Sequence, residues 1–158
     1  MAEPVPAGLF GAEPIILERL RAVLDRSVQV LAAPSLDAVL AGTQPPRAVY
    51  VMWRGAAVQT PERTDGRATR ITARWMVLIT VGNAAQSDTG APARAAAGAL
   101  VDAVLDALMG FRPDGPGSAP LVLTDLPNPG YIKGYQWVPI VFSHTLTHRV
   151  SPTATPYI

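Results

Sequence analysis

The sequence predicts an α+β fold, in which two main helices pack on one face of a mostly antiparallel or mixed β-sheet. Two segments, 14–25 and 93–108, carry apolar residues at helical spacing. Two others, 69–81 and 135–150, are long and rich in β-forming residues. The elements show no internal repeat and no regular βαβ succession, which argues against a doubly wound parallel sheet.

The first helix is expected to begin near Pro14, because proline is favoured in the first turn of a helix. Its apolar residues recur every three or four positions, with charged residues between them: Ile16, Leu20, Val23 and Leu24. A short strand around Val28 and Val30 follows and ends at Pro34.

A brief second helix is expected over 36–41. Ser35 is a suitable N-cap, and Gly42 is a suitable end. The next strand, 47–54, is rich in β-formers, and after it the pattern dissolves into polar sequence over 55–68.

The strand 69–81 has a well-specified buried face. Its odd-numbered positions are mostly large and apolar: Ile71, Ala73, Trp75, Val77, Ile79 and Val81. The other face carries Arg70, Thr72, Arg74 and Thr80. Consecutive strands usually pair, so this strand and 47–54 should form a hairpin with a long tip.

The remaining elements are the long helix, which Gly110 ends, and two strands, 121–125 and 135–150. Pro139 removes one backbone donor, so the last strand should lie at an edge or carry a bulge there. We expect one domain over 1–158, with extended or mobile termini at 1–10 and 151–158.

Composition excludes several functional classes. The chain has 158 residues, a net charge of +1 and no cysteine, so it lacks the positive field for sequence-specific nucleic-acid binding and any thiolate chemistry. Its start has no basic region followed by an apolar run, and no apolar stretch reaches membrane-spanning length. We therefore expect a chain assembled in the cytoplasm, without a membrane partner.

No catalytic, metal or cofactor site is predicted. His144 and His148, four apart in a strand, would lie roughly 13 Å apart, too far to share one ion; solvated or pore-facing histidines are the favoured interpretation. Asp102 and Asp106 are one helical turn apart and are expected on the solvent face. No phosphate-binding loop and no GxSxG nucleophile motif is present.

The most distinctive polar feature is a series of arginines around the hairpin tip: Arg54, Arg63, Arg67, Arg70 and Arg74. Arginine suits interfaces, because its planar head makes bidentate pairs and stacks on aromatic rings. A solvated hairpin and a contact with a neighbouring subunit or partner remain open as interpretations. Trp75 is expected in the core, and Trp137 on the other sheet face or in an interface.

The order of segments resembles the tail terminator family of tailed bacteriophages, including those of Mu-like phages. The resemblance rests on AEPIILERLRAVL, RAVYVMWRG, RWMVLITVGN, ALVDAVLDALMGFRPDG and WVPIVFSHTLTH, taken in order. It implies a non-enzymatic virion protein of the tail or neck that forms a hexameric ring on the tail tube. It further implies partners in the tube protein and a head-completion or neck protein, with DNA passing through the ring.

Three other functions stay open from the sequence alone. A head–tail adaptor of the same phage neck would share the size and the assembly role. A monomeric binding module would show a single subunit mass at all concentrations. A metal-dependent hydrolase would use His144 and His148.

Overall fold

The computed structural model describes residues 8–42, 45–59, 65–82, 91–132 and 134–150. The elements, in chain order, are α1 Ala12–Val23, β1 Gln29–Ala32, α2 Leu36–Ala41, β2 Arg47–Val58, β3 Ala68–Gly82, α3 Ala91–Leu108, β4 Val122–Asp125, β5 Gly130–Ile132 and β6 Tyr135–Arg149. The expected α+β class is confirmed, and β5 is the one element that was not expected.

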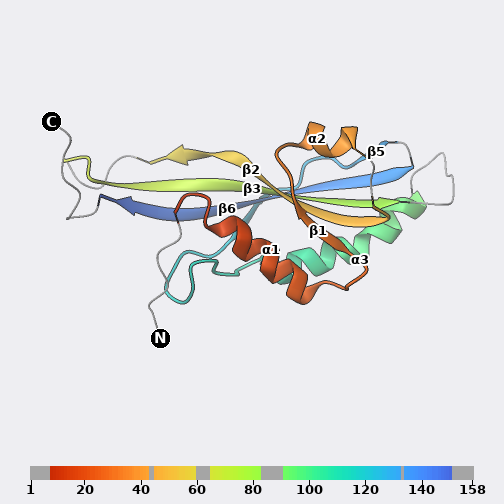
Figure 1. Cartoon of the computed structure of the whole chain (residues 1–158), viewed down its shortest axis with the longest axis horizontal. Coiled ribbons are helices and arrows are strands. Elements are labelled where there is room, and N and C mark those ends of the chain that lie inside the picture. Colours follow the sequence, from red (N-terminus) through yellow and green to blue (C-terminus); the bar gives the residue numbers. More distant parts are fainter. Residues whose placement is uncertain (1–7, 43–44, 60–64, 83–90, 133, 151–158) are drawn as a thin grey trace.

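The strands form one mixed sheet in the order β1-β2-β3-β6-β4, with β5 also on β6 (Figure 1). β1 pairs with β2 in parallel, and α2 lies in the crossover that this pairing requires. All other pairs are antiparallel, and β2 and β3 form the expected hairpin.

The main core lies between the sheet and the two long helices, α1 and α3, which cover one face together (Figure 1). Trp75, Phe142 and Leu20 are fully buried there. Each such side chain contributes about 1.5–3 kcal/mol by leaving water. The expected face of β3 is confirmed, because its odd-numbered residues from Ala73 to Val81 are in this core.

The opposite face is more apolar than its sequence pattern indicated. A second cluster gathers under α2: Val39, Ala48, Tyr50, Met52, Met76, Leu78 and Val141, with Trp137 packed against it. Thr80, expected on a polar face, is buried here. Trp137 therefore covers the other sheet face, the first of its two expected places, and Gly130 leaves room for its indole.

β2 continues four residues past the expected end at Arg54. The register with β3 shifts between Trp53 and Ala56, and Gly55 has a φ of 84°. A residue in this left-handed conformation forms a bulge, after which pairing resumes through Val58. The glycine and the small residues after it therefore interrupt the apolar pattern without ending the strand.

The prediction that the last strand lies at an edge or carries a bulge at Pro139 is met only in part. The β3–β6 register passes through Pro139 without a shift, so no bulge occurs there. β6 is a central strand, but the ladder on its other edge is interrupted between Trp137, paired with β5, and Val141, paired with β4.

Of the termini expected to be extended or mobile, 1–7 and 151–158 lie outside the described residues. Across the described part of the chain, none of the helices has both the length and the hydropathy to cross a bilayer.

Candidate interaction surface on the strand arm

Three strands run on beyond α1 and α3 and form an arm at one end of the sheet (Figure 1). We use the name arm for 54–58 of β2, 68–74 of β3 and 143–149 of β6. Antiparallel pairing holds these three segments together, with the bulge at Gly55 in β2 and with Ala68 opposite Arg149 at the far end. The arm has two faces: one on the side of α1 and α3, the other on the side of α2.

The α2 side of the arm carries arginines and hydroxyl groups. Alternation along the paired strands places Arg70, Arg74 and Arg149 on it, with Thr72, Ser143, Thr145 and Thr147 between them. The hydroxyls of Thr72 and Thr145 lie 3.1 Å apart and share a hydrogen bond. This face is therefore basic and able to donate several hydrogen bonds.

Two of the predicted arginines, Arg54 and Arg74, line the same hollow of about 350 Å³. The bulge brings them together, because the guanidinium of Arg74 lies over Gly55, where an added Cβ would be 3.7 Å from it. Asp125 of β4 lines the hollow too. The sequence predicts that Asp125 ends a short strand, but not that it lies near the arginines, because this proximity depends on β4 pairing with β6.

The other arginines of the series lie farther along the arm. Arg70 is exposed on the α2 side, and Arg67 is exposed in the turn that leads into β3. The backbone N–H of Arg67 donates to Asp65 at 3.0 Å, and its carbonyl accepts from Val150 at 2.9 Å. Arg63 lies outside the described residues.

On the α1/α3 side, the arm carries an apolar strip that the sequence analysis did not single out. Val58 lies opposite Ile71, which lies opposite Leu146 on the next strand. Val58 is 70% exposed, and Ile71 and Leu146 are half-buried. Alternation in 69–81 had assigned Ile71 to the core, but the helices do not extend this far (Figure 1).

The expectation of solvated or pore-facing histidines is wrong for His144. Its side chain is buried, with 1% exposure, and Nε2 lies 3.4 Å from the Asp114 carboxylate. Burial lowers the pKa of His144, and Asp114 offsets part of that shift. The segment that carries Asp114 is remote in sequence, which is why strand alternation did not reveal this burial. His148 is exposed.

The described residues contain no group of three or more His, Cys, Asp or Glu side chains that could hold a metal ion. Asp102 and Asp106 lie exposed on α3, as expected.

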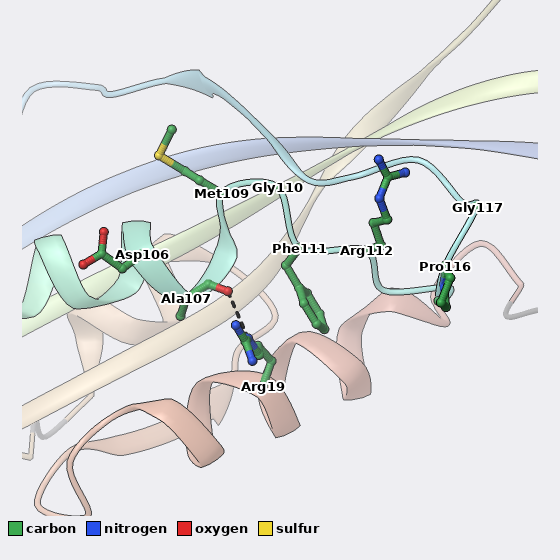
Figure 2. A pocket seen from close by; sticks show the side chains of 10 residues that line it. Arg19, Asp106, Ala107, Met109, Gly110, Phe111, Arg112, Pro116 and Gly117 are labelled. Carbon is green, nitrogen blue, oxygen red and sulfur yellow. Dashed lines mark hydrogen bonds between the residues drawn. The ribbon is translucent and has the colours of Figure 1, made fainter.

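A larger hollow, of about 710 Å³, lies between α1 and the segment that follows α3 (Figure 2). Arg19 reaches across it to donate to the Ala107 carbonyl at 3.1 Å, and its guanidinium lies 5.0 Å from the ring centre of Phe111. Arg112 donates to the Ser118 carbonyl. Both cations are therefore engaged in holding the fold together.

Comparison with known families shows which family the chain belongs to. The family model described as phage tail terminator protein matches residues 7–152. The chain belongs to this family. The match includes every helix and strand described above. Tail terminators are structural proteins rather than enzymes, so the chain is a structural component of a virion tail.

A solved structure has the same fold as this tail terminator family member. It comes from a structure titled "Virion of native gene transfer agent (GTA) particle", with a TM-score of 0.50 and 16% identity. The alignment covers 82% of this chain and 90% of that one. None of the curated proteins compared with the chain matches it significantly.

Proposed function

We propose that six copies of this chain close into a ring that caps the tail tube. The ring stops tube polymerisation and offers a docking surface to the head-completion or neck protein. The observation that carries the proposal is the tail terminator match, which spans residues 7–152. The chain acts, in this proposal, as one domain.

The shape of the subunit supports assembly. A closed ring with cyclic symmetry requires two unlike patches on each subunit, which meet head to tail. The arm extends past the helices and exposes one basic face and one partly apolar face. Such an arm can contact a neighbour without any change to the subunit core.

For the contacts themselves, we propose that Arg54, Arg63, Arg67, Arg70 and Arg74 lie against an adjacent subunit or the tail tube. Among the described members, Arg54, Arg67, Arg70 and Arg74 are all exposed, and all four belong to the arm or to the turn at its end. Reversing Arg63, Arg67 and Arg70 to Glu should weaken assembly, because like charges would then replace attractive ones. Unchanged ring formation and unchanged tail length would refute this assignment.

The capping role is tested with the tube protein of the same particle. We expect native mass spectrometry to detect a complex of ring mass bound to tube protein, and tails of uncontrolled length when the chain is omitted. The mass must be measured with the tube present, because the tube can act as the template for the ring. Binding to the portal or connector, and not to tube protein, would instead identify a head–tail adaptor.

A further inference from the structure

The end of the arm combines an apolar strip with positive charge. Val58, Ile71 and Leu146 are adjacent across three strands, and Val150, 39% exposed, follows β6. Arg67 is exposed beside them, in the turn that leads into β3. Single exposed apolar residues are ordinary, but a contiguous group next to charges is typical of a contact surface.

A second exposed feature lies on the other layer of the molecule, along α3. Ala95, Ala99, Asp102, Asp106 and Met109 are all exposed and alternate in steps of four and three residues. This spacing places them in one stripe along the helix, opposite its buried side. Met109, at the end of the stripe, is 53% exposed.

The acidic part of this stripe reaches the end of α3, where a cation rather than a carboxylate is favoured. Asp106 lies in the last turn of α3, which contains no basic residue. The C-terminal end of a helix carries partial negative charge, so a carboxylate there is stabilised by a nearby cation, and Arg19 lines the same hollow as Asp106. The described residues supply no ion-pair partner for Asp102 or Asp106.

We propose that the arm end of one copy packs across the outer stripe of α3 in the next copy. Val58 and Val150 then contact Ala99 and Met109. Arg67 lies beside Asp102 and Asp106. This assignment rests on the proposed ring and names the two surfaces that form its subunit contact.

Two properties favour a second copy as the occupant of the arm end. The surfaces are complementary in charge, because the stripe from Ala99 to Met109 carries two carboxylates and no cation. They are also unlike and lie in different parts of one subunit, so the contact is heterologous and continues from copy to copy. An isologous dimer would use the same patch twice and could not extend to a ring.

Cysteine cross-linking tests this geometry directly, because the chain has no cysteine of its own. The double variant Val58→Cys with Met109→Cys, treated with a short bismaleimide, should give a ladder of covalent oligomers. Mixing the two single variants should stop at a covalent dimer. The matched control replaces Met109→Cys with Val23→Cys on α1, which is 45% exposed and lies outside the stripe.

A charge swap provides an independent measurement. Arg67→Asp should weaken ring formation by about 5-fold or more, because an acid would then face Asp102 and Asp106. Adding Asp102→Arg and Asp106→Arg to the same chain should restore assembly. Circular dichroism of each variant checks that the exposed substitutions leave the fold intact.

The outcomes separate the two proposals. Rings that form while the Val58/Met109 pair cross-links no better than the Val58/Val23 control would overturn the arm–α3 contact and leave the ring standing. Cross-linking of Val58→Cys to tube protein alone, or a swap that fails to restore assembly, would also overturn it. A chain that stays monomeric both alone and with tube protein would overturn the ring and the contact together.

Discussion

At the residue scale, the burial of His144 has a thermodynamic consequence. Its imidazole is buried, and Nε2 lies 3.4 Å from the Asp114 carboxylate. Burial is the larger influence and lowers the pKa of His144, so the folded state favours the neutral form. The unfolded chain therefore binds a proton at a higher pH than the folded chain does.

We expect stability to decline as the pH falls below about 6.5, the ordinary histidine value, because the unfolded state then binds more protons. The contribution is fully present above that pH and is lost as the pH falls through the lowered folded-state pKa. Urea denaturation at pH 7.5 and pH 5.5 measures it. His144→Asn should reduce the pH dependence, and His148→Asn, at an exposed position, should leave it unchanged. Equal pH dependence in wild type and His144→Asn would contradict this expectation.

Two glycines provide a second test at this scale. A Cβ at Gly130 would overlap the Trp137 indole, so Gly130→Ala should destabilise by about 1–3 kcal/mol through overpacking. Gly98, inside α3, has nothing within 4 Å of an added Cβ, so Gly98→Ala should stabilise by about 0.5–1 kcal/mol. Thermal unfolding of both variants shows whether each substitution raises or lowers the stability of the protein. A Gly130→Ala protein as stable as wild type would mean that Trp137 packs elsewhere.

Single-residue roles could be predicted from the sequence where local periodicity determines them. The core position of Trp75 and the exposure of Asp102 and Asp106 are of this kind. The burial of His144 could not be predicted, because the segment containing Asp114 covers it from another part of the chain. Asp125 approaches Arg54 and Arg74 for a similar reason, through strand pairing across a long separation.

At the scale of elements, Arg19 joins the two main helices. It donates from α1 to the Ala107 carbonyl near the end of α3 and lies over the Phe111 ring (Figure 2). A cation there satisfies a carbonyl near a helix C-terminus, where negative partial charge gathers. The contact fixes the position of α1 relative to the segment that follows α3.

Arg19→Ala should therefore destabilise the protein by about 1 kcal/mol, from the lost hydrogen bond and ring contact. Arg26→Ala is the matched control, since Arg26 is an exposed arginine after α1 and should change stability by less than about 0.5 kcal/mol. Chemical denaturation of both variants gives the comparison. A similar loss of stability in the two variants would show that the contact of Arg19 with Ala107 and Phe111 does not stabilise the fold.

The bounds of the helices and strands show which elements the sequence pattern predicts well and which it does not. The short helix α2 begins and ends as predicted, because Ser35 caps it by accepting from Ala38 and Gly42 ends it. β2 is longer than predicted, because Gly55 forms a bulge after which the strand continues. The apolar alternation stops at this bulge, so the sequence pattern did not indicate the last part of the strand. β5 was missed because three residues among prolines and glycines give no periodic signal, and only pairing with β6 makes them a strand.

At the scale of the whole molecule, the sheet changes character along its length. In the body, both faces are covered, by α1 and α3 on one side and by α2 with Trp137 on the other. In the arm, the same strands continue without helices (Figure 1). Their pairing places an apolar strip on one side and arginines on the other. An apolar strip of this kind is stabilised by a partner, which is consistent with assembly into a larger particle.

If the arm contacts acidic groups of the next copy, assembly should depend on ionic strength. Screening between exposed charges grows as the Debye length falls from about 10 Å at 0.1 M salt to about 3 Å at 1 M. We expect the concentration of half-assembly, followed by mass photometry, to rise with salt in the wild type. Asp102→Asn with Asp106→Asn should raise it at low salt and flatten the salt dependence, because the attraction to Arg67 is already removed. Glu18→Gln, which neutralises an exposed carboxylate on α1, is the control and should keep the wild-type slope. A steep slope that persists in the Asp102/Asp106 variant would assign the electrostatic contact to other residues.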